Sequence, residues 1–155
     1  KTLKSHWLGN EWVFVMVNTK TILVLSVIAL ACAVTCLPAR AQNTCSGVDR
    51  TLSKERAEAF EPSVARQLRA KQVDIMQSFR FRGWSILYVD PHQSEEVFVF
   101  YSSNPMRTNY VTLWSGAARE DEQDQIRAWT IKNAPGIPHA LANCFAWHVT
   151  RDRDK

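Results

Sequence analysis

Large apolar residues near the middle of the chain follow a helical spacing. The residues that recur at multiples of four are Leu52, Phe60, Val64 and Leu68. This spacing predicts helical structure with one apolar face over 53–71. Ser53 is the predicted N-cap, because its hydroxyl can accept a hydrogen bond from the first helical turn. Pro62 interrupts the pattern, since proline lacks the N–H that an inner turn needs. The sequence therefore predicts two short helices or one kinked helix in preference to one straight helix.

From residue 73 the period of the pattern falls to two. One side of an extended segment over 73–82 would carry Val73, Ile75, Phe79 and Phe81, and the other side Asp74, Ser78, Arg80 and Arg82. This alternation predicts a strand with one face on the core and one in solvent. Three more strands are predicted at 84–89, 97–101 and 110–115. The segment 97–101 is apolar throughout, which predicts cover on both faces, and the short connections favour an antiparallel meander.

The C-terminal part of the chain returns to helical patterns. A polar segment at 119–124, acidic at 120–122 and 124, leads into Ile126 and Trp129, which predicts a helix that stops at the Asn-Ala-Pro-Gly segment 133–136. Pro138 then opens a predicted short helix that runs to Cys144. Alternating apolar residues at 145–150 predict a final strand, and one continuous helix over 138–150 is the alternative. The predicted fold is α+β: an antiparallel sheet of about four to five strands packed against two to three helices, with one disulfide.

The segment 21–37 is apolar and uncharged, with Lys20 before it and small residues at Ala39 and Ala41. This combination predicts a signal peptide that is cleaved before Gln42, with translation starting at Met16 and residues 1–15 as an upstream extension. The protein would then be periplasmic or secreted, with a bacterial envelope as the expected setting. A retained membrane anchor is the alternative, although the run is at the short end for a span. A lipoprotein anchored at Cys32 or Cys36 is disfavoured, because neither cysteine has a large aliphatic residue three positions before it.

Cleavage would leave a single domain of 114 residues, 42–155, with two cysteines, Cys45 and Cys144. In an oxidising compartment these can form only one intramolecular bond, so a Cys45–Cys144 disulfide is predicted. The net charge falls from +4 to about +1, because residues 1–41 hold four basic residues and one acidic residue. That balance does not support nucleic-acid binding. Arg80 and Arg82 can still contribute to a local basic patch, although such residues are more often a solvated face.

Catalytic chemistry has few candidates in this sequence. It holds no glycine-rich phosphate loop, no paired-cysteine metal motif and no motif of a known hydrolase or other family, so no metal or cofactor is predicted. Asp90, His92 and His148 are the candidate catalytic residues, with Asp90 and His92 in a predicted turn. His148 would lie on the same face as Cys144, where a buried, hydrogen-bonded histidine is the simpler interpretation.

Aromatic residues are the other candidate feature. Trp84 and Tyr88 share a face within one predicted strand, as do Tyr110 and Trp114 within another, and together they are the candidate ligand-binding residues. The leading expectation is a small exported binding or inhibitory protein whose partner is a protein or small ligand in the cell envelope. An exported hydrolase with a site assembled from distant Asp and His residues is the alternative. A purely structural envelope protein is the third.

Overall fold

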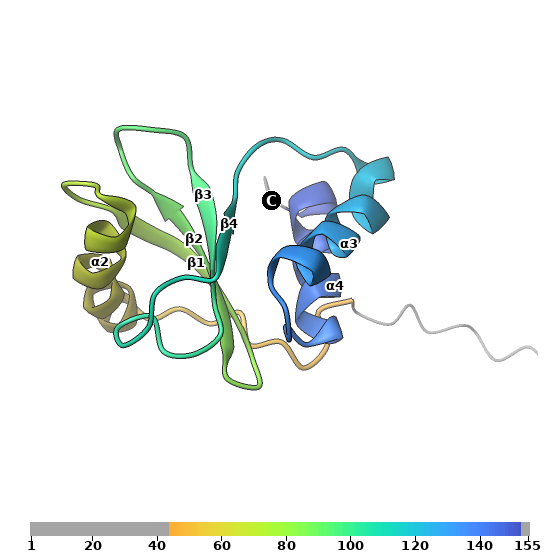
Figure 1. The fold of residues 1–155 in the computed structure, drawn as a ribbon, viewed down its shortest axis with the longest axis horizontal. Helices are drawn as coiled ribbons and strands as arrows, with labels where there is room; N and C mark the ends of the chain where they lie inside the picture. Colours follow the sequence, from red (N-terminus) through yellow and green to blue (C-terminus); the bar gives the residue numbers. More distant parts are fainter. Residues whose placement is uncertain (1–43, 153–155) are drawn as a thin grey trace, which may run out of the picture. The chain divides into compact units, whose positions relative to one another are not determined.

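A four-stranded antiparallel sheet lies between one helix and a pair of helices in the computed structural model, which describes residues 44–152 (Figure 1). The strands are adjacent in chain order: β1 (Asp74–Phe81), β2 (Trp84–Asp90), β3 (Val97–Tyr101) and β4 (Thr112–Trp114). One face is covered by α2 (Lys54–Leu68) and the other by α3 (Gln123–Asn133) and α4 (His139–Arg151), with the short 3-10 helix η1 (Glu120–Glu122) before α3. The predicted α+β fold with an antiparallel meander is confirmed.

Both faces of the sheet are buried, and alternation along the strands divides the core in two. On β2, Leu87 and Val89 pack with α2, whereas Ile86 and Tyr88 pack with the residues of α4. All five residues of β3 are buried, as the apolar segment 97–101 predicts. The turn between β1 and β2 has only two residues, Arg82 and Gly83, and both have positive φ (48° and 86°). Tight hairpin turns need this backbone because it matches the twist of the strands.

The alternation predicted over 73–82 is wrong in the middle of β1. Val73 and Ile75 lie in the core against α2, but Phe79 lies in the core against α4. The strand pairing gives the reason: Ile75 and Gln77 face consecutive residues of β2, so Met76 is an extra residue in a β-bulge. Every side chain beyond the bulge therefore points to the opposite face from the one that simple alternation gives.

The predicted solvent face of β1 is only partly exposed. Asp74 is exposed, but Ser78 is 1% exposed because α2 covers this part of the strand. Arg80 is half-buried and pairs with Asp49. The polar residues predict a strand with one buried face. Because α2 packs on the predicted solvent side, both faces of β1 are at least partly buried.

Residues 54–68 form a single helix, α2, so the two-helix prediction is wrong. Pro62 lies inside this helix and faces solvent, as does Glu58 four residues earlier. Because Glu58 is exposed, water can satisfy the carbonyl that a proline at position 62 leaves without its helical partner. Burial of Phe60 and Val64 on the opposite side holds the helix together. Ser53 caps it as predicted, accepting a hydrogen bond from the Arg56 N–H.

The strand predicted at 145–150 is also wrong, and the continuous-helix alternative is correct. α4 runs from His139 to Arg151 without a break. It packs against both the sheet and α3, and eight of its thirteen residues are buried. A helix that is apolar on most sides satisfies an alternating pattern as well as a helical one. β4, predicted over 110–115, has only the three residues Thr112–Trp114, while α3 ends at Asn133 as predicted.

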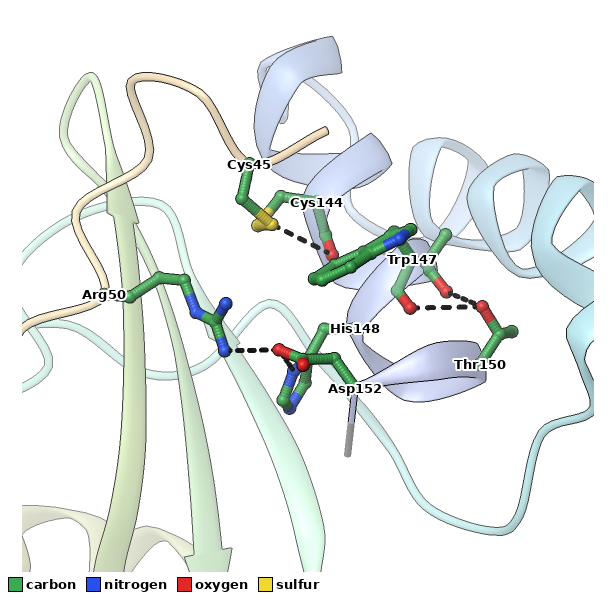
Figure 2. A network of polar contacts seen from close by, with 8 residues as sticks. Cys45, Arg50, Cys144, Trp147, His148, Thr150 and Asp152 are labelled. Atoms are coloured by element: carbon green, nitrogen blue, oxygen red, sulfur yellow. Dashed lines mark hydrogen bonds and ion pairs between the residues drawn. A yellow bond between two sulfur atoms is a disulfide. The ribbon is translucent and has the colours of Figure 1, made fainter. Parts of the chain in front are cut away.

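The segment 44–52, which we call the N-terminal arm, is joined to the rest of the domain at three points. Cys45 and Cys144 form the predicted disulfide, with Cα atoms 4.5 Å apart. Arg50 forms an ion pair with Asp152 just after α4, at 2.8 Å (Figure 2). The backbone of Asp49 makes two hydrogen bonds with that of Arg80 on β1. The arm thereby connects α4 to the sheet.

The predicted signal peptide, its apolar core 21–37, the start at Met16 and the cleavage before Gln42 all lie outside the described residues. No helix within 44–152 combines the length and apolar character that a bilayer span requires.

Candidate functional site

The two candidate catalytic histidines belong to different parts of the fold. His92 lies in the turn after β2, where its backbone N–H donates to Asp90 at 2.7 Å and its ring nitrogens lie 3.3 Å from Asp74 and 3.9 Å from Asp90. His148 lies in α4, fully buried, and its ring contacts Asp152 instead. Asp90, His92 and His148 therefore do not form one site. No group of three or more metal-ligating side chains occurs in the part of the chain described.

His148 is held between the aromatic core and an ion pair. Its ring centroid is 4.7 Å from that of Phe79, and its Nδ1 lies 3.5 Å from Asp152, which also binds Arg50 (Figure 2). Arg50 in turn lies over the Phe79 ring at 5.4 Å. Burial alone would raise the pKa of Asp152, but the hydrogen bond and charge of Arg50, with His148, outweigh it and hold that pKa below its usual 3.8. The arrangement stabilises the contact between the arm and α4.

We expect this carboxylate to make stability depend on pH. Because the pKa of Asp152 is lower in the folded than in the unfolded chain, its contribution is complete above about pH 4 and is lost as the pH falls through the folded value. The variant Asp152→Asn should lose about 1 kcal/mol of unfolding free energy at neutral pH and show a shallower decline in acid. Urea unfolding at a series of pH values measures both effects. Asp124→Asn, on a residue that is 94% exposed, is the control. Identical pH profiles for Asp152→Asn and wild type would contradict this role.

Three of the four candidate aromatic residues lie together on the α4 side of the sheet. Trp84 and Tyr88 are only 9% and 6% exposed, and Tyr88 stacks on Phe98 with ring centroids 4.3 Å apart. Trp114 is half-buried, and its ring lies 5.6 Å from that of Phe145 on α4. Trp84 and Tyr88 therefore present little surface to a ligand. Tyr110 lies apart from these three and is exposed.

Tyr110 belongs instead to an exposed apolar surface at the edge of the sheet. Four of the five large apolar residues that are exposed in the described chain fall between positions 106 and 113: Met106, Tyr110, Val111 and Leu113. β4 is the last strand of the sheet, and no strand within 44–152 pairs with its outer side. We call these four residues and the outer side of β4 the β4 edge surface.

A pocket of about 560 Å³ adjoins this surface on the α2 side of the sheet. Its apolar wall includes Leu113 from β4, Val97 from β3 and Leu68 from the end of α2. Leu113 pairs with Val99, whose side chain packs under α2, so Leu113 points to the same side. Although the end of α2 lines the same pocket through Leu68, Leu113 stays 39% exposed.

The segment before β4 is held in place by one glutamine of α2. The Gln67 side-chain amide donates to the carbonyl oxygens of Pro105 and Thr108, at 3.2 and 3.1 Å, and its oxygen accepts from the Tyr110 N–H at 3.1 Å. Ser63 adds a hydrogen bond to Pro105 at 3.1 Å. The loop therefore has a defined path, and it presents the β4 edge surface on an ordered backbone.

Tyr110 and Trp114 are candidates from the sequence, whereas Met106, Val111 and Leu113 are not. A signal for these three exists in the sequence: the eleven residues 108–118 carry no charge, although the segment lies largely outside the core. A backbone edge, exposed apolar side chains and an adjacent apolar pocket together can bind an extended chain, with main-chain hydrogen bonds along the edge and a side chain in the pocket.

Comparison of the chain with known proteins finds no matching family model, no matching curated protein and no matching solved structure.

Proposed function

We propose that this chain is a small exported binding protein that holds an extended, uncharged segment of a partner protein along β4. The observation that carries the proposal is the concentration of exposed apolar side chains, Val111 and Leu113 among them, on the open edge of the sheet. The partner segment would add a fifth strand to the sheet. Its backbone would supply most of the affinity, and its alternate side chains the specificity.

The composition of this edge supports the proposal. Open strand edges tend to pair with other chains, and proteins usually prevent this with charged residues, proline or bulges at the edge. β1, at the other edge, has such a bulge at Met76 and is flanked by the N-terminal arm through Asp49. The edge at β4 has neither charge nor proline from 108 to 118, and its short length of three residues is the protection that it keeps. An edge without charge or proline suits a sheet that gains a further strand from a partner protein.

The chemistry of the pocket beside Leu113 narrows the partner. Its wall of Leu68, Val97 and Leu113 would accept one aliphatic side chain of the incoming strand. Arg69 and Glu95 lie at the same pocket with opposite charges, so neither sign is favoured in the ligand. The expected ligand is therefore uncharged, with apolar residues at every second position. The Cys45–Cys144 disulfide supports an oxidising, extracytoplasmic setting for this binding.

Selection from a displayed peptide library tests the proposal even though the partner is unidentified. Peptides that are enriched on the purified protein should be uncharged and should alternate apolar with small polar residues. Their binding should weaken about tenfold or more in Leu113→Lys, because the new ammonium group would lie at the apolar pocket and the strand edge. Fluorescence anisotropy of a labelled peptide measures the affinity.

Met76→Lys is the matched control, since Met76 is also 39% exposed but lies on β1, at the opposite edge. It should bind the selected peptides as the wild type does. Equal losses in both variants, or enrichment of charged peptides that ignore Leu113→Lys, would contradict the proposal. A concentration-dependent dimer that Leu113→Lys dissociates would assign the edge to a second copy of the chain instead.

A further inference from the structure

A second pocket, of about 600 Å³, opens at the β1–β2 turn and shares no lining residue with the pocket beside Leu113. Its walls come from four parts of the fold: the N-terminal arm, α2, the β1–β2 hairpin and the loop after β3. Aromatic and apolar residues form part of the wall, notably Phe60, Phe81 and Pro105, and two arginines, Arg80 and Arg82, are also in it.

The two arginines differ in their electrostatic environment. Arg80 forms an ion pair with Asp49. The pKa of Asp49 is held below its usual value, chiefly by hydrogen bonds from the Thr51 hydroxyl and N–H and further by Arg80, so Asp49 stays ionised and neutralises Arg80 at neutral pH. Arg82 forms no ion pair with any carboxylate of residues 44–152. The pocket therefore contains one cation whose charge is not balanced locally.

Arg82 is exposed, and its backbone is held by the β1–β2 hairpin. It occupies the first place of the two-residue turn between β1 and β2, where the paired strands on either side hold the backbone. Its guanidinium lies over the Phe81 ring, 5.2 Å from the centroid, which restrains the side chain further. The planar guanidinium can bind a carboxylate through two parallel hydrogen bonds, and it loses less entropy per hydrogen bond than a lysine side chain would.

Polar groups on the pocket wall add to this recognition. Ser85, Ser103 and Asn104 line the pocket together with Arg82. Asn104 uses its side-chain oxygen to accept the Met106 N–H at 2.9 Å, and within the described residues its amide NH₂ group donates no hydrogen bond. That NH₂ group can donate to a ligand oxygen. The apolar walls would then contact the remainder of the ligand.

We propose that this pocket binds a small organic monoanion, a carboxylate with an apolar body, with Arg82 as the residue that pairs with the carboxylate. One unbalanced cation suits a monoanion better than a dianion, since a phosphate group would keep a second charge unpaired in a partly apolar site. Phe60, Phe81 and Pro105 would contact the apolar body. This ligand is separate from the peptide proposed at β4, and neither proposal depends on the other.

Titration with phenylacetate, followed by NMR, tests the inference on the purified protein. We expect saturable shifts of the Arg82 side-chain N–H and of the Trp84 indole signals, with millimolar affinity, as suits so small a probe. Phenylacetamide, which has the same shape without the charge, should bind at least about tenfold more weakly, and so should inorganic phosphate.

Two variants locate the interaction. Arg82→Gln should weaken phenylacetate binding at least about tenfold, and Arg82→Lys by less, because it keeps the charge but loses the planar fork. Arg127→Gln removes a guanidinium from α3, which contributes no residue to this pocket, and should leave binding unchanged. An absence of saturable shifts, equal affinity for the amide, tighter binding of phosphate, or unchanged binding in a folded Arg82→Gln variant would each overturn the inference.

Discussion

Removing the Cys45–Cys144 disulfide is expected to lower the free energy of unfolding by about 4–5 kcal/mol. The bond joins residues 99 positions apart, so it restricts almost the whole unfolded domain. Closing a loop of that length lowers the entropy of the unfolded chain by an amount worth about 4.7 kcal/mol at 25 °C. The free energy of unfolding of most small domains is only about 5–15 kcal/mol, so this loss would bring the variant close to unfolding at body temperature.

Urea unfolding of the double variant Cys45→Ser/Cys144→Ser measures this loss. Reductant should destabilise the wild type by a similar amount and should not affect the double variant, which separates loss of the bond from damage by the new side chains. A loss below about 1 kcal/mol would contradict this account, because the bond would then place little constraint on the unfolded chain.

The second large effect is expected at Phe98, the centre of the aromatic core. Its side chain is 1% exposed and its ring packs against five others: Phe79, Tyr88, Trp114, Phe145 and His148. Phe98→Ala should cost about 3–5 kcal/mol, because it leaves a cavity that β3, paired on both sides, cannot collapse to fill. Loss of the stacked and edge-to-face contacts adds to that cost.

Chemical denaturation followed by circular dichroism measures the effect. Phe98→Leu, which keeps most of the volume, should lose clearly less than Phe98→Ala. Met76→Ala, at an exposed position in the bulge of β1, should change stability by only about 0.5 kcal/mol. If Phe98→Ala and Met76→Ala had similar stabilities, the proposed centre of the core would be wrong.

The order of the elements and the disulfide could be predicted from the sequence, because those features depend on local patterns and on counting. Short, mostly apolar runs between turn-forming residues locate β2 and β3, and the two cysteines after residue 42 allow only one pairing. The pattern fails where tertiary packing overrides it. The bulge at Met76 reverses the faces of β1, and no local feature of the sequence marks an inserted residue.

The helix predictions fail for a related reason. Pro62 is a helix breaker by local rules, but it faces solvent in α2, where water can replace the missing hydrogen bond. In α4 the apolar residues that alternate at 145–150 also fit a helical period, since Leu141, Phe145 and Val149 recur every four residues on its buried side. In both helices the outcome depends on which side packs against the rest of the fold, and a single sequence does not show that packing.

Candidate sites are harder still to predict. Trp84 and Tyr88 are candidates by residue type, and the structure places them in the core. The β4 edge surface depends on Leu113 staying exposed beside the pocket at the end of α2, a property of the packed layers rather than of any motif. The sequence places Arg82 only in a local basic patch. Arg82 differs from Arg80 in its charge balance, because Arg80 forms an ion pair with Asp49, 31 residues away in the chain.

Amide hydrogen exchange with and without a selected peptide tests binding at β4 most directly. Strand addition would place new hydrogen bonds along the outer side of β4, so exchange should slow in the complex at those amides of 112–115 that point away from β3. The Val111 N–H already donates to the Phe100 carbonyl at 2.7 Å and is not among them. Amides on the outer side of β1 should exchange at the same rate in both states. Unchanged exchange at β4 in a saturated complex, or protection at β1 instead, would contradict the proposal that this protein binds its partner through the open edge of its sheet.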